Sequence, residues 1–126
     1  MESNSKIKSF TDLNSWKESH QLVLMVYKIT ESFPKEEVFR LTSQMCRAVV
    51  SITSNIAEGF SRNSAKEKFQ FYAISLGSLT EIQNQLTIAK DLNYISLDRF
   101  QKLNNHVIIV NKLVHGLMKT VSDRRF

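Results

Sequence analysis

The chain has 126 residues, of which 42% are hydrophobic and 23% charged, and its formal net charge is +5. These values are ordinary for one folded globular domain and argue against an intrinsically disordered chain. Three glycines and one proline are too few for a turn-rich β architecture, and the single cysteine, Cys46, excludes an internal disulfide and a thiolate zinc site.

The first predicted helix covers residues 11–33. Apolar and aromatic positions recur at alternating steps of three and four, which is the spacing of a seam in a helical bundle. This seam consists of Leu13, Trp16, His20, Val23, Tyr27 and Thr30. A second stripe lies beside it and consists of Leu22, Val26, Ile29 and Phe33. Asp12 or Thr11 can cap the start, and Pro34 ends the segment.

The second predicted helix, residues 38–63, carries two stripes. Its apolar stripe stays within about 40° of one line at 100° per residue and consists of Leu41, Met45, Val49, Ile52 and Ile56. A polar stripe lies nearly opposite and consists of Arg47, Ser51, Ser54, Glu58 and Arg62. A core helix needs only the first stripe, so the second faces water, another subunit or a ligand. Gly59 can end the helix, kink it or admit a close neighbour.

The third predicted helix covers residues 64–92. Ser64 followed by Glu67 resembles a capping box, and Asn93 is the expected stop. Its apolar stripe consists of Phe69, Tyr72, Leu76, Leu79, Gln83 and Leu86. Gly77 lies in mid-helix, where glycine costs roughly 1 kcal/mol against alanine. We therefore expect another backbone to pack closely at this position.

The fourth predicted helix covers residues 96–122 and opens at Ser96 or Asp98. Its seam consists of Phe100, Leu103, Val107, Val110, Val114, Leu117 and Val121. Four long helices joined by short loops predict one all-α domain over residues 1–126, an antiparallel up-down four-helix bundle. The first and fourth helices carry more apolar surface than one interior stripe requires, so we expect a homo-oligomer.

The positive charge belongs to the end of the chain. Residues 96–126 carry six basic side chains against two acidic ones, which accounts for +4 of the total. One of the six basic residues is Arg99. The other five are the candidate phosphate contacts, and they are Lys102, Lys112, Lys119, Arg124 and Arg125. Such an excess is compatible with RNA or DNA binding, and it is also common on a solvated helix end.

The motifs of catalysis and metal binding are missing from the sequence. His20, His106 and His115 have no glutamate three residues before them, as a di-iron bundle site requires, and we expect His106 and His115 to be exposed. No phosphate loop or nucleophile elbow occurs. Glu58 is a lone carboxylate that can simply pair with Arg47 or Arg62. We therefore expect no enzyme, cofactor or metal.

Targeting signals are also missing from the sequence. The polar residues 1–10 lack the apolar region of a signal peptide, and no apolar run approaches the ~20 residues of a membrane span. We therefore expect a cytoplasmic protein with no membrane partner.

Several segments together resemble a known family. They are Phe10–Trp16, Val26–Thr30, Phe33–Glu37, Leu41–Gln44, Arg47–Ser51, Ser54–Arg62 and Gly77–Leu86. The chain resembles, over roughly residues 10–120, the four-helix-bundle proteins encoded in intervening sequences of bacterial 23S ribosomal RNA genes. Asn-Ile-Ala-Glu-Gly at residues 55–59, with its flanking arginines, is the most specific part.

The resemblance implies a left-handed up-down bundle that commonly assembles as a homopentamer. A related branch is the accessory protein of diversity-generating retroelements, a basic pentamer that binds nucleic acid and a reverse transcriptase. The matching polar residues are Arg47, Asn55, Glu58, Arg62, Ser78 and Glu81. Cys46, Thr53 and Gln83 depart from the usual pattern, and the charge of +5 is below that of the retroelement branch.

Three functional hypotheses follow. The first is a non-enzymatic homo-oligomeric scaffold, a pentamer, that binds RNA or DNA. The alternative is a pure protein-interaction module without nucleic-acid binding, whose polar stripe joins subunits. A nuclease that uses Glu58 comes last.

Overall fold

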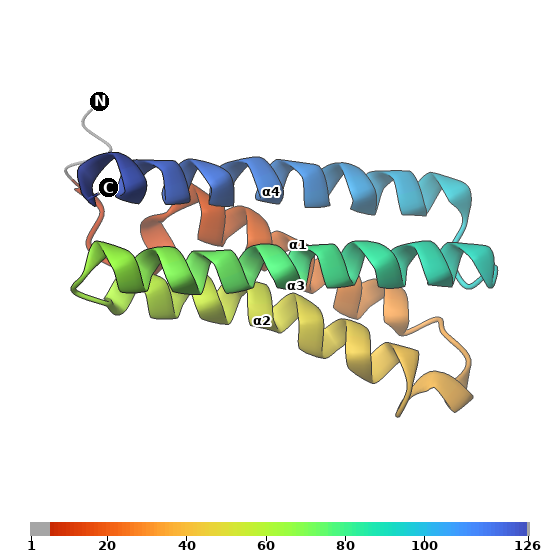
Figure 1. Cartoon of the computed structure of the whole chain (residues 1–126). Helices are drawn as coiled ribbons and strands as arrows, with labels where there is room; N and C mark the ends of the chain where they lie inside the picture. Colours follow the sequence, from red (N-terminus) through yellow and green to blue (C-terminus); the bar gives the residue numbers. More distant parts are fainter. Residues whose placement is uncertain (1–5, 126) are drawn as a thin grey trace.

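The computed structural model describes residues 6–125, with side chains described for residues 6–122. In this range the chain forms four long helices, α1 (Asn14–Thr30), α2 (Leu41–Ser61), α3 (Ala65–Asp91) and α4 (Leu97–Arg125). Short 3-10 helices, η2 (Phe10–Asp12) and η3 (Lys35–Glu37), precede α1 and α2. Each long helix runs back along the one before it, and α1 also contacts α4, which closes the bundle (Figure 1). The predicted all-α four-helix bundle is confirmed, while its left-handedness stays a prediction.

Side-chain caps determine where the later helices begin. The Ser64 hydroxyl accepts a hydrogen bond from the Glu67 N–H at 3.1 Å, and the Ser96 hydroxyl accepts one from the Arg99 N–H at 3.2 Å. Asn93 follows α3 with a φ of 64°, a left-handed conformation that asparagine tolerates at a helix end. The cap at Ser64 and the stop near Asn93 are confirmed, and Ser96 rather than Asp98 caps the fourth helix; the Glu67 side chain of a full capping box is not among these bonds.

The start of α1 differs from the prediction. Asp12 accepts hydrogen bonds from the Lys8 and Ser9 N–H groups and forms a capping box with Ser9, but this box starts η2. The chain then becomes extended at Leu13, and α1 begins at Asn14 without a side-chain cap. The first long helix is therefore shorter than residues 11–33.

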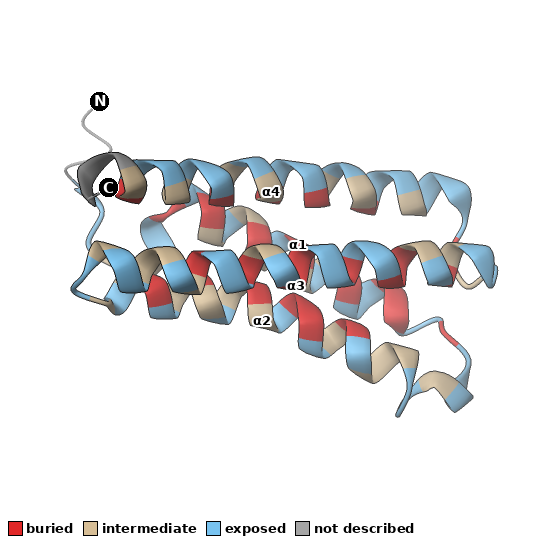
Figure 2. Ribbon diagram, in the orientation of Figure 1, coloured by how far each residue is buried: buried red, intermediate tan, exposed pale blue. Residues whose placement is uncertain are grey.

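The core lies along the bundle axis, where the buried residues of the four helices face one another (Figure 2). The apolar seam predicted for the second helix is buried from Met45 to Ile56, and only Leu41 is partly exposed. On α4 the buried residues are Leu103, Val107, Val110, Val114 and Val121, all of them members of the predicted seam.

The buried face of α1 is not the predicted main seam. It centres on Leu22, Val26 and Ile29, the stripe expected to lie beside that seam, whereas Tyr27 is 47% exposed. Ser15 and Ser19 extend this face into the core. A buried serine is tolerated where its hydroxyl bonds within its own helix, as Ser19 does to the Trp16 carbonyl at 3.0 Å.

The buried face of α3 also differs from the predicted apolar stripe, because it includes serines. Ser75 and Ser78 are buried against α2, where the Ser75 hydroxyl donates to the Ile52 carbonyl at 2.9 Å. Gln85 is buried, whereas Gln83, placed on the predicted stripe, is exposed and bonds to Asn104 of α4. Small polar side chains therefore form part of the α2–α3 contact.

Gly59 on α2 and Gly77 on α3 differ in their surroundings. A Cβ added at Gly59 would lie 2.7 Å from the Tyr72 ring and 3.1 Å from the Phe71 Cβ, so this glycine admits α3 to close contact. A Cβ added at Gly77 meets nothing within 4 Å. The expected close packing at Gly77 is wrong within the chain, because the residue lies on the exposed side of α3.

Further contacts join helices that are distant in sequence. His106, expected to be exposed, has a side chain only 17% exposed, and its Nε2 lies 2.8 Å from the Glu18 carbonyl oxygen on α1. His115 is exposed, as expected.

Among the described residues, no helix combines the length and the hydropathy needed to cross a membrane.

Glu37 links the start of α2 to the turn between α3 and α4. Its carboxylate accepts hydrogen bonds from the Tyr94 hydroxyl at 2.7 Å and from the Leu41 N–H at 3.2 Å. These two bonds, that of Tyr94 first, hold the pKa of Glu37 below its ordinary value of 4.5. A pKa lowered by folding stabilises the protein above the unfolded-state value, and this stabilisation is lost as the pH falls through the folded-state value.

We therefore expect Glu37→Gln to melt at a lower temperature than the wild type near neutral pH. The two melting temperatures should converge as the pH falls from about 7 to about 3, because the wild-type carboxylate is then protonated as well. Thermal unfolding followed by circular dichroism across this range measures the difference. A gap that stays constant with pH would contradict the role given to the Glu37 charge.

Candidate functional site

The polar stripe of α2 faces outward. Arg47, Ser54 and Glu58 are exposed, whereas Ser51 and Arg62 are half-buried. These residues follow α2 along the side opposite its buried face, as the spacing predicts. The residues of this surface therefore separate into those that have partners within the chain and those that remain open to a partner.

Ser51 is the centre of a hydrogen-bond cluster between α2 and α3. The Ser78 hydroxyl donates to the Ser51 hydroxyl at 2.8 Å, and the Asn55 amide donates to the Ser51 carbonyl at 2.8 Å. Ser78 is only 7% exposed. Two of the residues matched by the family resemblance, Asn55 and Ser78, are therefore engaged within the subunit.

Glu58 and Arg62 form an ion pair near the end of α2. The Arg62 Nη2 lies 2.6 Å from the Glu58 Oε2, and the guanidinium lies over the Phe71 ring of α3 at 4.7 Å. The pairing offered as an alternative for Glu58 is therefore present, with Arg62 as the partner. Within the described part of the chain, no group of three or more histidine, cysteine, aspartate or glutamate residues could hold a metal ion.

Arg47 and Glu81 line a common hollow between α2 and α3. It has a volume of about 410 Å³ and a mainly polar wall, and it is lined by Phe39, Ser43, Gln44, Arg47, Ala48, Ser51 and Glu81. An adjacent hollow of about 510 Å³ is mainly apolar and is lined by Tyr27, Val38, Phe39, Thr42, Ser43, Cys46, Arg47 and Val50. Arg47 and Glu81 are thus two predicted interface residues that line the same hollow and are exposed to solvent.

Phe39 lies at the junction of these two hollows and is 94% exposed. It follows η3 in the loop that leads into α2, and Val38, Tyr27 and Val50 around it are also exposed. We call Tyr27, Val38, Phe39 and Val50 the Phe39 surface. Helical periodicity does not reveal this surface, because Phe39 belongs to no helical stripe. The available signal is the apolar pair Val38 and Phe39 between charged residues; the predicted helix over residues 38–63 includes Phe39, whereas α2 begins only at Leu41.

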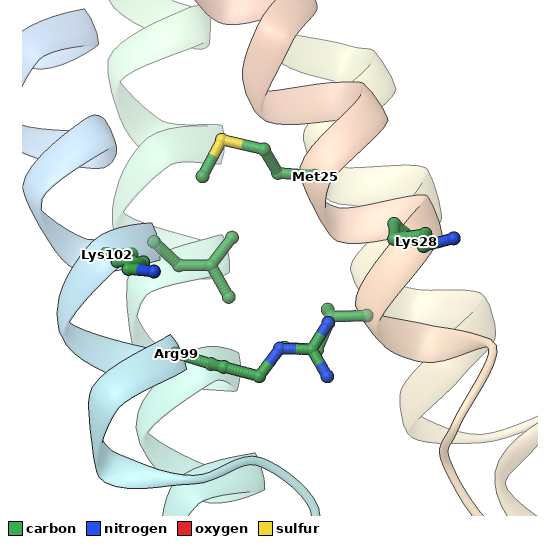
Figure 3. A pocket seen from close by; sticks show the side chains of 6 residues that line it. Met25, Lys28, Arg99 and Lys102 are labelled. Carbon is green, nitrogen blue, oxygen red and sulfur yellow. The ribbon is translucent and has the colours of Figure 1, made fainter.

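The basic residues of α4 do not share one face. At 100° per residue, Lys112 and Lys119 lie about 20° apart on the outward side, whereas Lys102 is turned by about 80–100° from them. Lys102 instead lines a hollow between α1 and α4 together with Arg99 and Lys28 (Figure 3). Arg124 and Arg125 lie outside the residues whose side chains are described.

The chain matches the family model of the 23S rRNA-intervening sequence protein over residues 11–116. It belongs to this family. The chain is also similar to a protein of known structure and unknown function from the S23 ribosomal protein family of Bacteroides thetaiotaomicron. The identity is 21% and the TM-score 0.78, over 94% of this chain and 99% of the other, which shows a shared fold. A comparison with curated proteins gives no match.

Proposed function

We propose that this member of the family is a non-enzymatic scaffold that assembles into a homo-oligomer, a pentamer, through the Phe39 surface. The observation that carries the proposal is the 94% exposure of Phe39. Burying a phenylalanine side chain contributes about 1.5–3 kcal/mol, so leaving this one in water is costly unless a partner covers it. Apolar residues gathered on a surface commonly mark a protein interface.

The surroundings of Phe39 also suit a subunit contact. The two hollows beside it provide an apolar wall and a polar wall, and the polar one carries the opposite charges of Arg47 and Glu81. A ring of copies requires two different surfaces on each subunit, because its contacts are heterologous. Leu24 on α1, which is 50% exposed, supplies an apolar residue for a second surface.

Light scattering on the wild type and on Phe39→Ser tests the assembly. We expect the wild type to have about five times the monomer mass of 14.6 kDa and Phe39→Ser to dissociate into smaller particles. Phe39→Leu is the matched control, because it keeps an apolar side chain and should keep the assembly. A wild type that is only monomeric, or a Phe39→Ser variant with the wild-type mass, would contradict this interface.

Nucleic-acid binding is the second part of the proposal, and the net charge of +5 per chain favours it. Five copies would carry about +25, enough for many phosphate contacts. We expect filter binding to show affinity for short RNA or DNA at low salt, which weakens steeply as salt is raised. If neither nucleic acid is retained at low salt, the protein is instead a pure protein-interaction module, and the scaffold proposal stands.

A further inference from the structure

A hollow of about 190 Å³ lies between α1 and α4, on the side of α4 that carries Lys102 (Figure 3). We call it the cationic pocket. It is lined by Met25, Lys28, Ile29, Arg99, Lys102 and Leu103. Ile29 and Leu103 belong to the buried core and Met25 is half-buried, whereas the three basic side chains are exposed. The pocket therefore has an apolar floor and a positively charged rim.

The charge of the rim is only partly balanced within the chain. The Lys102 Nζ lies 3.8 Å from an oxygen of Asp98, and both side chains are largely exposed. Neither Lys28 nor Arg99 forms an ion pair with any residue in the described part of the chain. Arg99 therefore places an unpaired cation at the pocket, and the nearby Lys28 adds positive charge that raises the local concentration of anions.

Arg99 is the basic residue best placed to bind a ligand. Its guanidinium reaches from α4 toward α1, and Met25 reaches from α1 toward α4, whereas the Lys28 ammonium points away from the gap (Figure 3). A planar guanidinium binds a carboxylate or phosphate through two parallel hydrogen bonds. The flexible Met25 side chain can adapt its shape to an apolar group beside it.

The size and lining of the pocket restrict the ligand. Sites for drug-sized molecules have volumes of about 300–1,000 Å³, so a hollow of about 190 Å³ accommodates only a small apolar body. The six lining residues include no aromatic side chain, although proteins that bind single-stranded nucleic acids stack the bases on aromatic rings. The floor therefore favours a short aliphatic group over a nucleotide base.

We propose that the cationic pocket binds a small amphipathic anion. Its carboxylate or phosphate head lies against Arg99, with Lys102 as a second cation, and its aliphatic body covers the apolar floor. This site shares no lining residue with the Phe39 surface, which consists of Tyr27 on α1, Val38 and Phe39 in the loop before α2, and Val50 on α2.

Four small probes test the ligand class. Octanoate and octyl phosphate each have an aliphatic chain and an anionic head group, which is a carboxylate in the first and a phosphate in the second. Acetate and inorganic phosphate have the anionic group without the chain. We expect ligand-detected NMR titrations to show that an octyl probe binds at least about tenfold more tightly than its bare head group, because buried methylene groups add affinity. Binding of both octyl probes, or of one, supports the proposal and identifies the head group.

Three variants of the full-length chain test the position of the site. Arg99→Gln should weaken octanoate binding about tenfold, because it removes a charged hydrogen-bond donor. Lys28→Gln should weaken it less. Lys112→Gln is the matched control, because it removes the same charge from the outward side of the same helix and should leave the affinity unchanged. Circular dichroism verifies that each variant is folded.

Met25→Gln tests the floor without a large change in side-chain length. It should weaken octanoate binding and leave that of acetate unchanged. The proposal is overturned if neither octyl probe binds the wild type, or if the bare head groups bind as tightly as the octyl probes. It is also overturned if Lys112→Gln weakens binding as much as Arg99→Gln, because the attraction would then be a general effect of charge.

Discussion

Replacing Ile52 with alanine should lower the free energy of unfolding by about 2–5 kcal/mol. Ile52 is fully buried on α2, and its carbonyl accepts the hydrogen bond from Ser75 of α3. Truncation leaves a cavity at the contact between these two helices, and their shared serine bond restricts how far they can close it. The loss therefore includes both the buried methyl groups and the unfilled space.

Urea denaturation at one fixed protein concentration measures this effect, because the stability of an oligomer depends on concentration. Ile108→Ala is the matched control. Ile108 is 42% exposed on α4, so the same truncation should change the free energy of unfolding by no more than about 0.5 kcal/mol. Equal losses for the two variants would contradict the position of the core.

Replacing Gly59 with alanine should lower the free energy of unfolding by about 1–2 kcal/mol. The new methyl group would overlap the Tyr72 ring, which is only 2% exposed and has little room to shift. Overpacking of this kind costs typically about 1–3 kcal/mol, and the better helix propensity of alanine offsets up to about 1 kcal/mol of it.

The same substitution at Gly77 should change the free energy of unfolding in the opposite direction. Nothing lies within 4 Å of the added Cβ, so the change should raise the free energy of unfolding by about 0.5–1 kcal/mol through helix propensity alone. Chemical denaturation of the two variants in parallel measures both signs. A stabilised Gly59→Ala variant would show that α3 does not approach α2 at this glycine.

The periodicity of the sequence predicts α2 and α4 well because their buried positions are large aliphatic residues. Met45, Val49 and Ile52 on α2, and Val107 and Val110 on α4, are buried as their spacing requires. Such side chains remove apolar surface from water wherever the helix meets its neighbours, so their spacing alone identifies the inner face.

The same reasoning fails on α1 and α3, where serines lie on the inner face. Ser19 and Ser75 are fully buried, because each hydroxyl donates to a backbone carbonyl and its small side chain admits a close neighbour. A pattern that treats serine as a surface residue therefore places the expected buried face at the wrong angle about the helix axis. The Ile52 carbonyl that accepts from Ser75 can be recognised only when α2 and α3 are placed together, whereas the bond of Ser19 stays within α1.

The candidate site, too, can be predicted only in part from the sequence. The sequence predicts that Arg47 and Glu58 lie on the outer side of α2, and the structure agrees. It could not predict that Arg47 shares a hollow with Glu81, nor that Arg99 of α4 and Lys28 of α1 line the same pocket. These pairs are distant along the chain, and no local pattern relates them.

The sequence by itself determined the helical class, the order of the four helices, the cap at Ser64 and the family. All of these depend on interactions within a few residues or on motifs that can be read along the chain. Only the tertiary structure decided which side of α1 and α3 faces inward, why Gly59 must be glycine, and where Phe39 and the cationic pocket lie. These features depend on the rotation and separation of packed helices, which are determined by side chains that meet from different parts of the chain.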